Sequence, residues 1–143
     1  MGKLLDRNRE IQARAENLRV LESALRQVLT SGKEDQLLSG RAADGSHFAP
    51  IAASTARRPR ANPRPLVPHG SLSRVVTGYR VDFETVTGEP RLVLTAGWPG
   101  VEWVRYHQSG TRRMPRRDPG GFRAEDLDRC RQLLRRHVMG GNI

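Results

Sequence analysis

The sequence predicts an α+β domain in which a long N-terminal helix and a C-terminal helix pack on one face of a small antiparallel sheet. Apolar residues recur at helical spacing near both ends of the chain, and they alternate with polar residues in the middle. Segments rich in proline and arginine separate these regions. A chain of 143 residues with 36% hydrophobic residues fits a single domain spanning residues 1–143.

The N-terminal helix is predicted to cover residues 1–31. Gly32 follows its last periodic residue, where a helix C-terminal cap is expected. The apolar stripe is compatible with a coiled-coil seam, but packing on the domain's own sheet is the favoured interpretation. The stripe recurs every seven residues, at Leu4, Ile11, Leu18 and Leu25.

Residues 39–68 are predicted to form an extended loop or arm. One helical turn is expected around Ala52 to Arg57. Before it, a turn at Asp44 to Ser46 precedes an apolar cluster of Phe48, Pro50 and Ile51. This cluster either anchors the loop to its own core or seats against a neighbouring subunit, and the core anchor is favoured. The prolines that exclude a regular helix or central strand are Pro50, Pro59, Pro63, Pro65 and Pro68.

Residues 72–108 are predicted to be the antiparallel sheet region. Two strands with period-two alternation flank a turn at "TGEP", and the preceding "SLSRVVTG" is a candidate for a further strand. The segment Val101 to His107 fits either a strand or a short helix, and the helix is favoured. The inward-facing residues of the two strands are Tyr79, Val81 and Phe83, then Leu92, Leu94 and Ala96.

Residues 111–122 are predicted to be a basic loop, and residues 123–139 a C-terminal helix. Acidic residues come early in this helix and basic residues late, which matches the helix dipole. The single cysteine, Cys130, is expected to be a buried core thiol. It belongs to an apolar stripe of Leu127, Cys130, Leu134 and Val138.

Positive charge is concentrated in the second part of the chain. The whole chain carries 25 basic and 15 acidic residues, and residues 57–143 hold 17 and 8 of them, a net charge of +9. Such a surface attracts nucleic acid, acidic proteins or anionic membranes. Of the basic residues, 23 are arginine, a skew that genome base composition also produces.

The residue patterns predict neither an enzyme nor a cofactor site. The four histidines lack metal-ligand spacing, and no glycine-rich phosphate loop is present. Asp82 and Glu84 share an outward strand face, as in a solvated surface. No apolar run reaches the roughly 20 residues that cross a bilayer, so we expect a protein made in the cytoplasm without a membrane partner.

Three blocks in this order resemble the phage virion morphogenesis family of tail-completion proteins: "DGSHFAPIAASTARR" (44–58), "PLVPHGSL" (65–72) and "VRYHQSGTRRMPRR" (104–117). The resemblance implies a structural virion protein of the phage tail or head–tail junction (neck), without catalysis. Its expected partners are copies of itself in a ring, with a hexamer as the expected copy number, the tail tube or terminator, and neck or connector proteins. DNA passing through the junction is a further expected contact.

The sequence departs from the family pattern in two places. His69 replaces a usual threonine, and "RRDPGGF" lacks a compact Arg-Pro-Phe. The alternative function is a basic accessory protein that binds nucleic acid through phosphate without reading sequence. The residues expected at an interface or anchor are Phe48, Pro50, Ile51, Arg57, Arg58, Arg60, His107, Gln108, Arg112, Arg113, Arg116 and Arg117.

Overall fold

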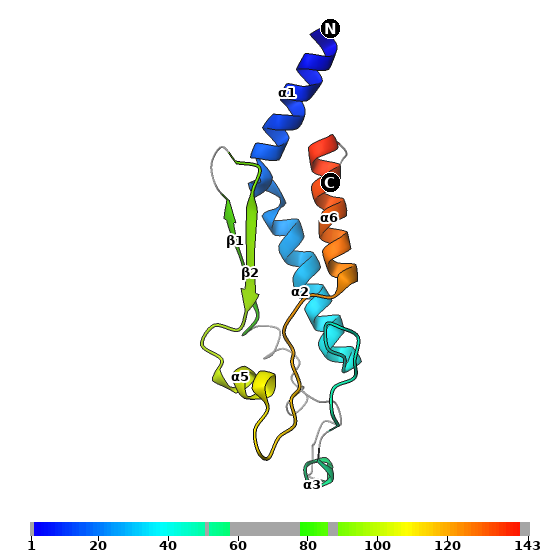
Figure 1. Ribbon diagram of the computed structural model, residues 1–143, viewed down its shortest axis with the longest axis vertical. Coiled ribbons are helices and arrows are strands. Elements are labelled where there is room, and N and C mark those ends of the chain that lie inside the picture. The colour runs from blue at the N-terminus through cyan, green and yellow to red at the C-terminus, as the bar shows by residue number, and fades with distance from the viewer. Residues whose placement is uncertain (1, 51, 58–77, 86–88, 141–143) are drawn as a thin grey trace.

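The computed structural model describes residues 2–50, 52–57, 78–85 and 89–140 (Figure 1). It confirms the α+β class, with helices at both ends of the chain and a two-stranded antiparallel sheet. The elements are α1 (Gly2–Glu16), a 3-10 turn η1 (Leu18–Leu21), α2 (Glu22–Ser39), α3 (Ala53–Ala56), β1 (Arg80–Thr85), β2 (Leu92–Gly97), α5 (Glu102–Ser109) and α6 (Ala124–Met139).

Helix α2 forms the centre of the domain. It contacts β1 of the hairpin on one side and α6 on the other, so the hairpin, α2 and α6 stand side by side in Figure 1. Apolar residues from η1, α2, the hairpin and α6 meet in one core. Burial of this shared surface stabilises all of these elements together. The buried core residues are Leu18, Leu21, Leu25, Leu29, Tyr79, Val81 and Cys130.

The hairpin has the alternation that the sequence predicted. Val81 pairs with Ala96 and Phe83 with Leu94, and all of these side chains pack in the core or against it. The intervening residues Asp82 and Glu84 are exposed on the outer face. Part of the predicted "TGEP" turn, and the further strand proposed for "SLSRVVTG" up to residue 77, lie outside the described residues.

The prediction of one continuous helix over residues 1–31 is wrong. The α-helix ends at Glu16, and the chain passes through η1 before α2 begins (Figure 1). The break frees backbone carbonyl groups that would otherwise accept helical hydrogen bonds. His137 Nε2 lies 3.1 Å from the carbonyl oxygens of both Arg14 and Asn17, so its N–H supplies a donor from α6.

The cap predicted at Gly32 is also wrong. Gly32 is buried inside α2, which continues to Ser39 and ends at Gly40 with φ of 67°. A Cβ atom on Gly32 would lie 2.4 Å from the Asp126 carboxylate. Glycine is therefore required at this position because α6 approaches α2 closely, and the predicted loop starts at Gly40.

Only part of the leucine stripe packs in the expected way. Residues from Leu18 onward are buried against the hairpin and α6. Helix α1 contains no buried residue, and Leu4 and Leu5 are 69% and 58% exposed. Figure 1 shows the first turns of α1 projecting beyond the end of α6. The predicted packing on the sheet is thus wrong for the N-terminal half of the stripe.

The remaining helices agree with expectation. Helix α3 corresponds to the predicted turn around residues 52–57, α5 confirms the helical interpretation of residues 101–107, and α6 opens after Arg123. Cys130 is buried, and burial raises the pKa of its thiol. Among the described residues, no helix has both the length and the apolar character needed to cross a membrane.

Candidate interaction site

Two of the three family-like sequence blocks meet at one end of the molecule. We call this region the loop junction and define it as residues 40–50 and 104–121. It comprises the turn after α2, helix α5 and the basic loop that leads to α6, at the lower end of Figure 1. The middle block, residues 65–72, lies outside the described residues.

The turn after α2 is fixed by local hydrogen bonds. The Asp44 carboxylate accepts hydrogen bonds from the Ser46 hydroxyl at 2.6 Å and from the Ser46 backbone N–H at 2.9 Å. These bonds, the hydroxyl bond first, hold the pKa of Asp44 below its usual value. The predicted turn at residues 44–46 is therefore confirmed.

Phe48 fastens this turn to the domain. Its backbone N–H donates to the Gly40 carbonyl at 2.8 Å, and its side chain, 8% exposed, packs on Leu37 with Trp98 alongside. This placement agrees with the core-anchor interpretation of the apolar cluster. Pro50 is exposed, and Ile51 lies outside the described residues.

Arg117 has an internal role, so of the two expected roles, interface or anchor, its placement agrees with the anchor and not with exposed docking. It is 7% exposed, and its guanidinium donates hydrogen bonds to the carbonyl oxygens of Ala49 and Pro50. Its backbone N–H donates to the His107 carbonyl at 2.8 Å. A buried guanidinium is stable only when its N–H groups have acceptors, and these two loop carbonyls supply them. Arg117 thereby ties the Phe48 loop to α5.

Lys33 of α2 is buried beside the loop junction. It is 3% exposed, and its Nζ donates three hydrogen bonds of 2.7 Å, to Gln36 Oε1, Pro119 O and Gly121 O. The ammonium also lies 5.5 Å from the Tyr79 ring centre and 5.6 Å from that of Trp98. Burial lowers the pKa of Lys33 to about 8. Lys33 therefore holds the end of the basic loop against the core.

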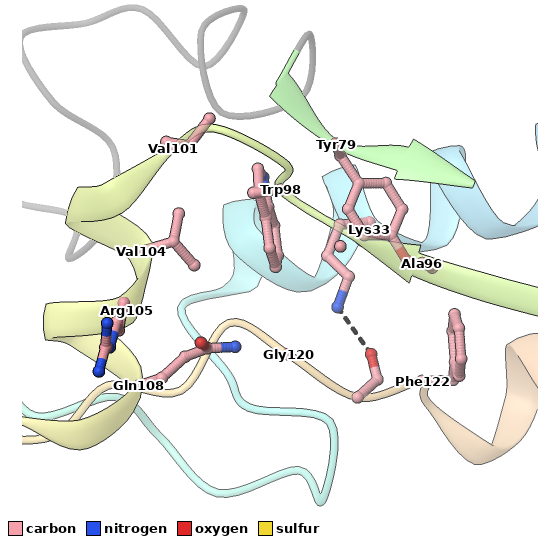
Figure 2. Close-up of a pocket in the computed structure, with 12 residues that line it drawn as sticks. Lys33, Tyr79, Ala96, Trp98, Val101, Val104, Arg105, Gln108, Gly120 and Phe122 are labelled. Atoms are coloured by element: carbon pink, nitrogen blue, oxygen red, sulfur yellow. Dashed lines mark hydrogen bonds between the residues drawn. The ribbon is translucent and has the colours of Figure 1, made fainter. Parts of the chain in front are cut away.

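A pocket of about 330 Å³ lies beside Lys33 (Figure 2). Figure 2 shows the Lys33 side chain flanked by Trp98 and Tyr79, with Phe122 further along the pocket, while Arg105 and Gln108 come from α5. Lys33 and Arg105 are the charged residues in its lining, and both are basic. A second hollow, of about 410 Å³, separates the turn at residues 42–48 from residues 116–121.

The basic loop keeps three of its four predicted arginines in solvent. Arg112, Arg113 and Arg116 are exposed. Arg116 forms a 3.2 Å ion pair with Asp118, an exposed pair that contributes little to stability. In the region that the structure describes, Arg112 and Arg113 form no ion pair. Their guanidinium groups are therefore accessible to solvent.

The other predicted interface residues divide between the junction and its surroundings. His107 is half-buried, and burial followed by the charge of Arg117 lowers its pKa. Gln108 is exposed and lines the pocket beside Lys33. Arg57 is exposed after α3, while Arg58 and Arg60 lie outside the described residues.

The buried polar groups of the loop junction are occupied in holding its loops together. All three Lys33 hydrogens have acceptors, so the amine is not poised as a nucleophile. Among the described residues, no three histidine, cysteine or acidic side chains gather closely enough to hold a metal ion.

Sequence reasoning missed Lys33 and the buried ion pair next to it. Asp126, 3% exposed, accepts two hydrogen bonds from Arg123, at 2.7 and 2.8 Å. A signal for Lys33 was present, because it interrupts a four-residue spacing in which every other member is leucine. That row is Leu21, Leu25, Leu29, Lys33 and Leu37, all at most 3% exposed.

Comparison of this chain with protein-family models, with curated proteins and with solved structures finds no match. The resemblance to the phage virion morphogenesis family therefore stays a prediction from the sequence blocks.

Proposed function

We propose that this chain is a structural virion protein that completes the phage tail or the head–tail junction, acting as a ring-forming subunit. The observation that supports this best is the loop junction, in which Arg117 joins two sequence blocks of the family resemblance. Residues 67 and 68 positions apart in the chain thus form one unit. The unit fixes the backbone of a loop whose arginines remain exposed.

A fixed loop that presents arginines suits docking on an acidic protein surface. Guanidinium groups pair with carboxylates in a planar, two-point geometry. Ordering the loop before binding lowers the entropy that binding would otherwise cost. The proposed partners are tail tube or terminator proteins and neck or connector proteins, in the virion's tail or neck.

Electron microscopy of particles assembled without the protein tests this role. We expect heads and tails that fail to join, or tails of incorrect length, and restoration when the protein is supplied. Particles that assemble normally without it would contradict the proposal.

A binding assay with purified tails tests the arginine loop. Reversing the charge of Arg112, Arg113 and Arg116 to Glu should weaken binding by about 100-fold, because several exposed cations then face carboxylates as like charges. The matched control reverses Arg129, Arg135 and Arg136, which are exposed on α6 away from the loop junction. Equal affinity of both variants would remove the docking role.

The alternative is a basic accessory protein that binds nucleic acid. The exposed Arg112 and Arg113 favour it, since such groups also bind phosphate. Filter binding across a range of salt concentrations separates the two. Tight binding at low salt with a steep salt dependence supports the alternative, and no measurable binding supports the virion role.

A further inference from the structure

A charged groove runs beside helix α1. The groove, of about 420 Å³, lies between α1 and the end of α6. Leu4 and Met139, 69% and 58% exposed, are at this same end of the domain. The groove residues are Lys3, Asp6, Arg7, Glu10, Ile11, Arg14, Met139 and Gly140.

Three groove residues carry charge in a defined order along α1. Lys3, Arg7 and Glu10 occupy positions i, i+4 and i+7, so they share one helix face in the order positive, positive, negative. Among the described residues, Glu10 pairs with Arg14 at 3.6 Å, in a largely exposed pair. Asp6 is the remaining charged group of the groove.

The outer face of the hairpin carries the opposite order. Glu84, Asp82 and Arg80 alternate along β1 and are all exposed, which gives negative, negative, positive. Val93 pairs with Glu84 in the sheet register, so a half-buried valine lies beside this row. In the part of the chain that the structure describes, Lys3 and Arg7 form no ion pair. The three strand residues form none there either.

The spacings of the two rows are compatible. The helix row spans about 10.5 Å at 1.5 Å per residue. The strand row spans about 13 Å at 3.3 Å per residue. Long lysine, arginine and glutamate side chains cover the difference. Self-pairing of α1 is less favourable, because with Leu4 and Ile11 at one seam position of the seven-residue repeat, Arg7 and Arg14 occupy the other seam position, where apolar residues are needed.

We infer that α1 of one copy of this chain lies along the outer face of β1 in a second copy, antiparallel to that strand. Lys3 then faces Glu84, Arg7 faces Asp82, and Glu10 faces Arg80, while Leu4 covers Val93. The contact joins two different surfaces, so it is head-to-tail and generates a ring when its rotation closes. The inference deepens the proposed function and rests on it for ring closure.

Sedimentation of the purified full chain across concentration tests the contact. Wild-type protein should associate, and the variants Lys3→Glu/Arg7→Glu and Asp82→Arg/Glu84→Arg should each raise the dissociation constant about 100-fold, because like charges then meet. Combining all four changes should recover affinity to within about tenfold of wild type. The control Arg9→Glu/Arg19→Glu alters the same charge outside the groove and should leave association unchanged.

A variant that leaves the charge unchanged tests the inferred contact in a second way. Leu4→Ser should weaken association by about tenfold through lost apolar contact. Circular dichroism checks that each variant remains folded. Monomeric wild type at every concentration, or a combined variant no better than either double variant, would overturn the inference.

The self-association readout is separate from the particle test. If the inferred contact fails while particles lacking the protein are still defective, the inference alone falls. If the charge exchange restores association but particles need no such protein, the proposed virion role falls and the contact stands.

Discussion

Helices α1 and α2 share one sequence pattern and meet opposite surroundings. In α2, Leu25 and Leu29 are 1% and 2% exposed between the hairpin and α6. In α1, Leu4 is 69% exposed although it lies one repeat before Ile11 in the same seven-residue spacing. The pattern identifies an apolar face, but it does not say which surface covers that face.

Under the inferred contact between copies, the two helices have separate tasks. Burial in α2 supplies the free energy that holds the domain together. Exposure in α1 leaves apolar area that a second molecule can cover. Changes in α2 should therefore act on folding, and changes in α1 on association.

The largest expected effect is the difference in stability between a variant at a buried leucine of α2 and one at an exposed leucine of α1. Leu25→Ala should lower the free energy of unfolding by about 3–4 kcal/mol, since it leaves a cavity in a packed core. Leu4→Ala should change it by no more than about 0.5 kcal/mol, as is usual at exposed sites. Urea denaturation of both variants measures the difference. Equal losses would show that α1 is part of the folding core.

Close approach of α6 to α2 provides the next test. Gly32→Ala should cost about 2–3 kcal/mol, because the added methyl displaces Asp126 from its buried pair with Arg123. Gly2→Ala in α1 is the matched control, since a Cβ there meets nothing within 4 Å. Thermal unfolding compares the two. A Gly32 variant as stable as the control would contradict the packing described between these helices.

The loop junction allows a comparison within one basic loop. Arg117→Met should destabilise the protein by about 1–3 kcal/mol because two loop carbonyls lose a charged donor. Arg113→Met removes the same charge from an exposed site and should have an effect below about 0.5 kcal/mol. Chemical denaturation gives both values. The reverse order would mean that Arg117 does not hold the junction.

Lys33 provides the most local test, because it concerns a single side chain. Burial lowers its pKa to about 8, against an ordinary value of 10.5. Between these values the unfolded chain binds more protons than the folded chain, so this group makes the free energy of unfolding rise with pH. Burial raises the pKa values of Cys130 and Tyr79, which act in the opposite direction at higher pH.

An NMR titration of the lysine side-chain carbons isolates Lys33 from those groups. The chain has only one other lysine, Lys3, so two signals are expected. One should have its midpoint near pH 8 and should disappear in Lys33→Arg. Two signals that titrate together would contradict the buried position of Lys33.

Local patterns were sufficient to predict much of the fold. The alternation of apolar and polar residues identified the inward faces of both strands, because successive side chains in a strand point to opposite sides of the sheet. Helix α6 was recognisable from its apolar stripe and its charge order. These features depend on neighbours within a few residues.

Features that depend on distant residues could not be predicted in the same way. Gly32 resembles a cap until Asp126, more than 90 residues later in the chain, is seen against it. Arg117 resembles its exposed neighbours, and only the carbonyls of Ala49 and Pro50 distinguish it. At the break after Glu16, backbone carbonyl groups accept hydrogen bonds from His137, which lies on another helix.

Hydrogen exchange at low and high protein concentration tests the contrast between α1 and α2 most directly. Amides of α2 should be protected at every concentration, because the domain's own core covers them. Amides of α1 should exchange rapidly in dilute protein and become protected as concentration rises, since a helix of 15 residues is marginal alone. Protection of α1 equal to that of α2 in dilute protein, or α1 exchange that never slows with concentration, would contradict the account.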